Sequence, residues 1–292
     1  MPQTAPWTIG RLLRWTSDYL RRHGSDSSRL DAEILLAEAL GCRRIDLYTR
    51  YDEVPDDAAR TAFRGLVRRR AEGTPVAYLV GRREFYSLNF RVTPDVLIPR
   101  PETELVVVTL IDLARQYPAD RALKICDVGT GSGVIAVCAA KHLPHARVTA
   151  VDISPAALAV ARANAEEHGV AERIEFVQGD LMNGLAADER FELVASNPPY
   201  VSQREMEQLS REVRDFEPTE ALLAGPRGTE VIEALVAQAA WRLQPGGRLV
   251  VEINPALYRA ACELIERDGR LVLESTVKDL GRQPRVIQVR RK

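Results

Sequence analysis

The chain has 292 residues, with 40 Lys or Arg against 41 Asp or Glu, so its formal net charge is -1. This balance excludes a strong global field that would draw the protein to nucleic acid or to a membrane surface. The four cysteines show no Cys-x-x-Cys spacing, and no apolar run is long enough to cross a bilayer. We therefore expect a soluble, cytoplasmic protein with reduced thiols, and its length predicts one large domain with a smaller one.

The first part of the chain predicts a small bundle of amphipathic helices. Apolar residues recur at helical spacing from Ile9 to Leu20 and again from Leu30 to Leu40. Ser28 and Asp31 predict a capping box at the start of the second helix, and Gly41 predicts its end. No strand pattern interrupts this region, which favours a helical domain.

The period of the sequence changes after Gly81. Leu88, Phe90 and Val92 alternate with polar residues, which is typical of a half-buried strand. We interpret this stretch as a strand or hairpin that links two domains. The expected division is a helical domain over residues 1–80, a β-hairpin linker over 81–98 and a second domain over 99–292.

The second domain alternates between short runs rich in Val, Ile and Leu and helical segments. The runs predict strands at 123–128, 148–151, 174–177, 191–195 and 249–253. Helices are expected at 134–141, 155–168 and 231–243, and a final pair of strands at 271–277 and 286–289. This alternation predicts an α/β fold of the Rossmann-like kind, with a mostly parallel sheet covered by helices on both faces.

A glycine-rich loop follows the first of these strands, with the sequence Gly129-Thr130-Gly131-Ser132-Gly133. Alternating glycines let the backbone approach a ligand closely, and the helix that follows offers unpaired N–H groups. Asp152 ends the next strand, where its carboxylate can accept hydrogen bonds from ribose hydroxyls, and Asp180 is placed to bind an adenine amino group. Val134 stands where dinucleotide-binding loops have a third glycine, which favours S-adenosylmethionine as the cofactor. A tight turn without a ligand is the alternative.

The fourth strand ends in Asn197-Pro198-Pro199-Tyr200. Each proline holds the preceding residue extended and lacks an N–H group, which leaves the Asn197 side-chain oxygen and the Pro198 carbonyl oxygen as acceptors. Two fixed acceptors suit a planar nitrogen with two hydrogens. The segment therefore predicts methyl transfer to an amide-like nitrogen by alignment and charge stabilisation, with Tyr200 against the flat face of the target and Pro199 beside it.

At these residues the chain resembles the class I methyltransferases that modify glutamine, specifically the HemK/PrmC family of peptide chain release factor N5-glutamine methyltransferases. The resemblance extends over nearly the whole chain. It includes further segments at Pro75 to Leu79, Glu84 to Tyr86, Leu97 to Glu104 and Val213 to Pro218. The segment Ile98 to Glu104 is the most diagnostic, because adenine methyltransferases share Asn-Pro-Pro-Tyr without it.

The resemblance implies a sheet with one antiparallel strand, an N-terminal helical domain for substrate recognition, and S-adenosylmethionine as the cofactor. It also implies methylation of the glutamine in a Gly-Gly-Gln loop of translation release factors, which would be the protein partner. By matching positions, Gly129 to Gly133, Asp152 and Asn197 would bind the cofactor, and Asn197 to Tyr200 would hold the glutamine amide. Leu181 stands at an adenine-binding position where relatives often carry an aromatic residue, and Asn254 stands where a glycine is usual.

Other functions stay open at this point. One is a glutamine methyltransferase of a ribosomal protein. Another is a nucleic-acid N6-adenine methyltransferase, although the charge balance and the lack of an inserted target-recognition domain argue against direct nucleic-acid binding. A third is a non-catalytic binder of the cofactor. The run Arg68 to Arg70 is interpreted as the solvated face of a helix. The four histidines share no metal-ligand spacing, so no metal site is predicted.

Overall fold

The computed structural model describes residues 6–118 and 120–292. It divides the chain into two compact units. Unit 1 comprises Met1–Gly81 together with Arg211–Phe216, and unit 2 comprises Arg82–Ser210 together with Glu217–Lys292. The hairpin assigned to a linker on the basis of the sequence thus groups with unit 2, and a short segment from the second half of the chain groups with unit 1.

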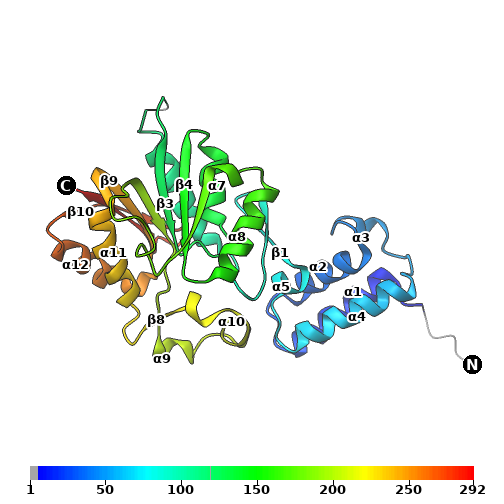
Figure 1. Cartoon of the computed structure of the whole chain (residues 1–292). Helices are drawn as coiled ribbons and strands as arrows, with labels where there is room; N and C mark the ends of the chain where they lie inside the picture. The colour runs from blue at the N-terminus through cyan, green and yellow to red at the C-terminus, as the bar shows by residue number, and fades with distance from the viewer. Residues whose placement is uncertain (1–5, 119) are drawn as a thin grey trace, which may run out of the picture. The chain divides into compact units, whose positions relative to one another are not determined.

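Unit 1 is a bundle of helices (Figure 1). Its elements are α1 (Ile9–Arg22), α2 (Ser28–Leu40), α3 (Asp46–Thr49), α4 (Asp57–Ala71), α5 (Val76–Val80) and α10 (Arg211–Phe216). Side-chain caps start two of the long helices: Thr8 Oγ1 accepts from the Arg11 N–H at 3.3 Å, and Asp56 Oδ1 accepts from the Ala59 N–H at 2.7 Å. The apolar faces of α1, α2 and α4 form the core of this unit.

The start of α2 differs from the prediction. Ser28 is the first helical residue and not the cap, and no capping box forms. Asp31 is instead buried, where its carboxylate accepts hydrogen bonds from the Ser25 and Ser27 hydroxyls at 2.7 and 2.8 Å. Leu30 is 40% exposed, and the buried face of α2 is formed by Ala32, Leu35 and Leu36 in its place.

The interpretation of Arg68 to Arg70 as a solvated face is wrong for its last member. Arg70 is buried, because it continues the stripe of Phe63 and Val67 along α4 at helical spacing. Its Nε lies 2.8 Å from Asp31 Oδ2, and an Nη lies 3.0 Å from Glu212 Oε2 in α10. Two carboxylates thus balance a buried guanidinium inside unit 1.

Unit 2 is built on a seven-stranded sheet in the order β10-β11-β9-β6-β3-β4-β5 (Figure 1). Its strands are β3 (Leu123–Val128), β4 (Ala146–Asp152), β5 (Ile174–Gln178), β6 (Phe191–Ser196), β9 (Leu243–Glu252), β10 (Leu271–Lys278) and β11 (Pro284–Arg291). Strands β3, β4, β5, β6 and β9 pair in parallel, whereas β11 runs antiparallel to both of its neighbours. The predicted α/β class, with a mostly parallel sheet and one antiparallel strand, is confirmed.

Helices cover both faces of this sheet. Successive side chains of each strand point to opposite sides, and apolar side chains on both sides pack against helices. Ile125 of β3 packs into one apolar cluster with α6, α7 and α8, and the next residue, Cys126, packs into the other with α11 and α12. These helices are α6 (Glu104–Ala114), α7 (Val134–His142), α8 (Pro155–Glu167), α11 (Glu230–Arg242) and α12 (Tyr258–Arg267). Shorter elements are β7 (Val201–Ser202), α9 (Gln203–Met206) and β8 (Leu223–Gly225).

The hairpin of β1 (Arg82–Phe85) and β2 (Leu88–Arg91) is anchored to unit 2. Phe85 and Phe90 are buried in the cluster that contains α6 and α7. The buried Asn164 of α8 accepts from the Arg91 N–H at 2.7 Å and donates to the Arg91 carbonyl oxygen at 3.0 Å. The same amide nitrogen donates to the Ser132 carbonyl oxygen at 2.8 Å, so one side chain fastens both the hairpin and the glycine-rich loop.

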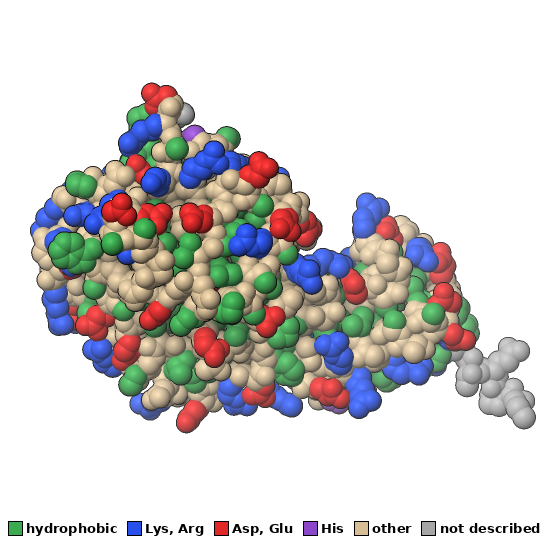
Figure 2. All heavy atoms as spheres, viewed as in Figure 1, with side chains coloured by type: hydrophobic (Ala, Val, Ile, Leu, Met, Phe, Trp, Pro, Cys, Tyr) green, Lys and Arg blue, Asp and Glu red, His purple; other side chains and the backbone are tan. Residues whose placement is uncertain are grey.

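The described parts of the chain contain no helix long and apolar enough to span a membrane. On the face in view in Figure 2, Lys and Arg side chains are interspersed with Asp and Glu side chains.

Candidate active site

The register of the parallel strands brings the predicted site residues to one edge of the sheet. Val128 pairs with Val151 on one side and with Ser196 on the other, and Ser196 in turn pairs with Val251. The residues that follow these positions are therefore neighbours in space. The structure thus brings together the glycine-rich loop, Asp152 and Asn197, as the sequence predicts, and it adds Glu252.

The glycine-rich loop takes a backbone conformation that favours glycine. Gly129, Gly131 and Gly133 have φ angles of 71°, 54° and 83°. A Cβ atom at Gly129 or Gly131 would meet no atom within 4 Å, whereas one at Gly133 would lie 3.1 Å from the Cβ of Ala161 in α8. The first two glycines therefore leave open space beside the backbone, and the third allows two helices to pack closely.

Asp127, just before this loop, is a site residue that the sequence analysis did not select. It is fully buried, and its Oδ2 accepts from Thr130 Oγ1 at 2.6 Å and from the Ala136 N–H at 3.1 Å. Its Oδ1 has no hydrogen-bond partner among the described residues. Burial raises the pKa of Asp127 to about 7, although both hydrogen bonds lower it. The available signal was an acidic residue within a strand run of mostly apolar residues.

Asp152 holds the loop from the neighbouring strand. Its Oδ2 accepts from the Gly131 N–H at 2.8 Å, and its Oδ1 accepts from the Ser154 N–H at 3.0 Å. Burial raises the pKa of this carboxyl group, and the backbone hydrogen bonds oppose that effect. Each oxygen keeps a lone pair for a further donor, so the geometry is compatible with a bound ribose.

The two positions predicted to contact adenine lie after β5. Asp180 is exposed, and its carbonyl oxygen accepts a turn hydrogen bond from the Asn183 N–H at 3.1 Å. Leu181 is half-buried, has a φ of 51° and packs against the apolar cluster that contains α11. A branched residue in this left-handed conformation is strained, which is common at ligand sites.

Asn197 is held by two side chains from distant parts of the sequence, which we call the Asn197–Thr103–Glu252 chain. Asn197 Nδ2 donates to Thr103 Oγ1 at 3.0 Å, and Thr103 Oγ1 donates to Glu252 Oε2 at 2.7 Å. Thr103 and Glu252 are buried, and burial raises the pKa of Glu252 to about 7. Neither role was predicted from the sequence, although Thr103 lies in the diagnostic segment and Glu252 lies in the strand predicted at 249–253.

The rest of the Asn-Pro-Pro-Tyr segment is closely packed. Pro198 is buried, and Pro199 and Tyr200 are half-buried. Burial, followed by the nearby Glu252 carboxylate, raises the pKa of Tyr200 to about 12, so its phenol stays protonated near neutral pH. Gly228 has a φ of 82°, and a Cβ atom there would lie 2.8 Å from the Tyr200 carbonyl oxygen. Only glycine permits this approach of the two backbones.

The diagnostic segment is tied to the loop that contains Glu217. This buried carboxylate accepts from the Ile98 N–H at 3.2 Å with Oε2 and from the Arg100 guanidinium at 2.5 Å with Oε1. Farther along, Glu102 lies 3.8 Å from Arg285, which also pairs with Asp279 at 2.8 Å. The charges of Arg100, Glu102 and Arg285 act on both Tyr200 and Glu252.

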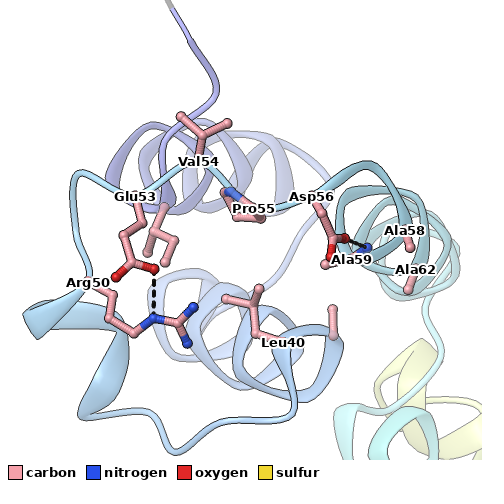
Figure 3. A pocket seen from close by; sticks show the side chains of 11 residues that line it. Leu40, Arg50, Glu53, Val54, Pro55, Asp56, Ala58, Ala59 and Ala62 are labelled. Atoms are coloured by element: carbon pink, nitrogen blue, oxygen red, sulfur yellow. Dashed lines mark hydrogen bonds and ion pairs between the residues drawn. The ribbon is translucent and has the colours of Figure 1, made fainter.

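A separate pocket of about 510 Å³ lies in unit 1 and is shown in Figure 3. Its polar groups are already engaged: Arg50 Nε donates to Glu53 at 2.8 Å, and Asp56 caps α4. This pocket shares no residue with the candidate active site, which lies wholly in unit 2. The described residues include no group of three His, Cys, Asp or Glu side chains suited to hold a metal ion.

Two family models match the chain. Residues 11–81 match the PrmC N-terminal domain, and residues 109–214 match the methyltransferase small domain. Among solved structures, a methyltransferase from Pyrococcus furiosus has a TM-score of 0.50 at 18% identity, and the match covers 71% of this chain and 90% of that chain. This likeness supports the class I methyltransferase fold.

Curated relatives are much closer in sequence. A release factor glutamine methyltransferase of Rhodopirellula baltica is 49% identical, over 98% of this chain and 97% of the relative. Another of the same name, from Geobacter sulfurreducens, is 42% identical, over 90% of each chain. The matches cover both the helical part and the sheet with its Asn-Pro-Pro-Tyr segment. The chain therefore belongs to the family of release factor glutamine methyltransferases.

Proposed function

We propose that this chain methylates the side-chain amide nitrogen, N5, of the glutamine in a Gly-Gly-Gln segment of translation release factors. The observation that carries this proposal is the orientation of Asn197. Its amide nitrogen is engaged by Thr103, so its oxygen is left for a substrate donor beside the carbonyl of Pro198. The names of the relatives, which match over nearly the whole chain, supply the protein substrate.

S-adenosylmethionine is the cofactor of this methyltransferase family, and its sulfonium supplies an electrophilic methyl group. The chain's own residues fit such a ligand. Gly129 and Gly131 leave open space beside the loop, and the buried Asp127 Oδ1 is an acceptor without a partner among the described residues. Asp152 would accept hydrogen bonds from the ribose hydroxyls, and Asp180 would accept one from the adenine amino group. Thr130, Ser132 and Gly133 shape the loop, and Leu181 would cover the base.

Asn197 and Pro198 present two oxygens to the two hydrogens of the glutamine amide. This fixes the plane of the amide and directs its nitrogen toward the methyl donor, which is how alignment lowers the barrier for a weak nucleophile. Carbonyl-type oxygens also stabilise the positive charge that develops on the nitrogen. The protonated Tyr200 flanks the amide with Pro199 and does not act as a base.

Unit 1 serves as the recognition domain for the release factor in this proposal. It carries an apolar groove of about 360 Å³ whose lining includes Trp7, Trp15 and Tyr19 beside the exposed Arg64. Trp15 stacks on Tyr19 with ring centroids 5.0 Å apart and is 47% exposed. Exposed aromatic and arginine side chains are typical of protein-binding surfaces. Because the proposed substrate acts in translation, we also propose a cytoplasmic location. The formal net charge of -1 supports the absence of direct nucleic-acid binding in this proposal.

A test of recognition compares two substrates, an intact release factor and a short peptide that contains Gly-Gly-Gln. Trp15→Ala is expected to raise the KM for the intact factor about three- to tenfold, because it removes exposed aromatic contact area, and to leave the KM for the peptide unchanged. Ile45→Ala is the control, since Ile45 is also an exposed apolar residue of unit 1, at 60% against 47% for Trp15, and does not line the groove. Equal KM changes for both substrates would contradict the role of unit 1.

The substrate itself is tested with labelled S-adenosylmethionine and three separate targets: purified release factors, ribosomal proteins and DNA. We expect label on a release factor, and peptide mapping should place it on the glutamine of Gly-Gly-Gln. Label only on a ribosomal protein, or only on DNA, would refute the proposed substrate.

A further inference from the structure

We propose that Thr103 and Glu252 are positioning residues, which fix the Asn197 amide with its nitrogen toward Thr103 and its oxygen toward the substrate. This inference rests on the proposed function and deepens it. In this proposal, groups outside the Asn-Pro-Pro-Tyr segment determine which atom of the Asn197 amide, Oδ1 or Nδ2, faces the substrate.

The Thr103 hydroxyl has a single proton to donate. The hydroxyl donates that proton to Glu252 Oε2 at 2.7 Å, a hydrogen bond that favours the ionised carboxylate. While Glu252 is ionised, the hydroxyl has only lone pairs left for Asn197. An amide that faced it with Oδ1 would place two acceptors against each other. Asn197 therefore donates with Nδ2 at 3.0 Å, and no described residue donates a hydrogen bond to its Oδ1.

The position of Thr103 in the chain supports a dedicated role. It ends the short 3-10 helix Pro101–Thr103 and directly precedes α6, where a threonine usually caps the helix with its hydroxyl. Here the side chain makes no capping hydrogen bond. It instead joins two residues that lie 94 positions after it, at Asn197, and 149 positions after it, at Glu252.

Burial strengthens the preference for one orientation of the Asn197 amide. Thr103 and Glu252 are 3% and 2% exposed, so water does not readily replace a lost partner. Glu252 is the last residue of β9, whose pairing with β6 and β11 fixes its backbone. Three further charges act on Glu252: the carboxylate of Glu102 in the 3-10 helix, and the guanidinium groups of Arg100 before that helix and of Arg285 in β11.

The test replaces the Thr103 hydroxyl without changing its shape. Thr103→Val is expected to lower kcat about tenfold or more on a purified release factor, while the Kd of S-adenosylmethionine changes less than about threefold. Thr103→Ser keeps the hydroxyl and should recover most of the rate. Thr109→Val, at a buried threonine of α6 outside the chain of hydrogen bonds, is the matched control and should leave kcat unchanged.

A double variant shows whether Thr103 acts through Asn197. Single-turnover assays with labelled cofactor measure residual rates in Asn197→Ala with and without Thr103→Val. We expect the second change to cause no further loss, because the amide that Thr103 orients is already absent. A loss as large as in the wild-type background, or wild-type kcat in Thr103→Val, would overturn the inference. If Thr103→Val unfolds, Thr103→Cys against Thr103→Ser repeats the comparison with side chains of similar shape.

The proposed function fails in a different way. If Asn197→Ala itself keeps the wild-type rate, the acceptor role of Asn197 is wrong, whatever Thr103 does. If Asn197→Ala is inactive and Thr103→Val is fully active, the proposed function stands and only the positioning role is refuted.

Discussion

The glycine-rich loop and the Asn-Pro-Pro-Tyr segment lie at the same edge of one sheet, but they are held in different ways. The loop is fixed largely by backbone geometry and by nearby partners: Asp127 directly before it and Asp152 on the adjacent strand. The Asn197 side chain is fixed by Thr103, which is in turn hydrogen-bonded to Glu252, and these three residues are far apart in the sequence. Both ends depend on the register of the sheet, but the contacts that hold the cofactor end span 21 and 32 positions, whereas those that hold Asn197 span 94 and 149 positions.

This difference predicts that the two regions respond differently to substitution. Changes in the glycine-rich loop should act mainly on cofactor affinity. Changes around Asn197 should act mainly on the rate of methyl transfer, because they alter alignment and leave the cofactor loop intact.

The largest expected effect is that of Asn197→Ala. Loss of one of the two substrate acceptors should lower kcat about 10²- to 10³-fold, since the amide nitrogen is no longer aligned or its charge stabilised. Cofactor affinity, measured by isothermal titration calorimetry, should remain within about threefold of the wild-type value. If cofactor affinity fell as much as kcat, the assignment of separate roles to the two regions would be wrong.

A smaller effect is expected for Gly131→Val, and it should fall on the cofactor. The φ of Gly131 is 54°, and a side chain there would fill the open space beside the loop. We expect the Kd of S-adenosylmethionine to rise about tenfold or more from this obstruction together with backbone strain of about 1–2 kcal/mol. The measurement is a calorimetric titration.

Gly24→Val provides the matched control for this strain. Gly24 also has a positive φ, of 86°, and open space around it, but it lies in unit 1. The Gly24→Val variant should lose about as much stability as Gly131→Val and should bind the cofactor with wild-type affinity. If both variants bind the cofactor as the wild type does, the glycine-rich loop is not the cofactor site.

The last expected effect falls on stability and not on activity or cofactor affinity: it is a pH dependence that comes from Asp127. Its pKa is raised to about 7 in the folded chain, above the ~4 of an unfolded aspartate. Between these two pKa values the folded state binds more protons than the unfolded state does. The contribution of Asp127 to stability is therefore complete below about pH 4 and is lost as the pH rises through about 7. The slope is at most about 1.4 kcal/mol per pH unit.

Asp127→Asn isolates this contribution, because Glu252, whose pKa is also raised to about 7, is present in both proteins. Urea unfolding at several values from about pH 5 to pH 8 should show the free energy of unfolding of the wild type falling relative to that of the variant. The difference should become constant above about pH 8. If the free energy of unfolding of the wild type instead rose with pH relative to that of the variant, the raised pKa of Asp127 would be contradicted.

Much of unit 2 could be predicted from the sequence, because its strands are apolar runs separated by clear helix signals. Strand β3 was placed at its observed bounds, and the carboxyl ends of β3, β4 and β6 identified the edge where the site forms. The glycine spacing and the two prolines after Asn197 are local signals, so neither required knowledge of the fold.

The rest depended on contacts between distant residues. Thr103 was identified from the sequence only as a member of the diagnostic segment, and its two partners could be recognised only once the sheet placed Glu252 near Asn197. Arg70 read as one of three surface arginines, although the helical spacing from Phe63 and Val67 already placed it on the buried face. Its pairing with Asp31 could not be predicted, since those residues are 39 positions apart.

The most direct test of the account is a crystal structure of the enzyme with S-adenosylhomocysteine and a peptide that contains Gly-Gly-Gln. We predict that the glutamine amide nitrogen lies within about 3.2 Å of both Asn197 Oδ1 and the Pro198 carbonyl oxygen, with Asn197 Nδ2 still directed at Thr103. A complex in which those two oxygens point away from the glutamine, or in which Asn197 turns Oδ1 toward Thr103, would contradict it.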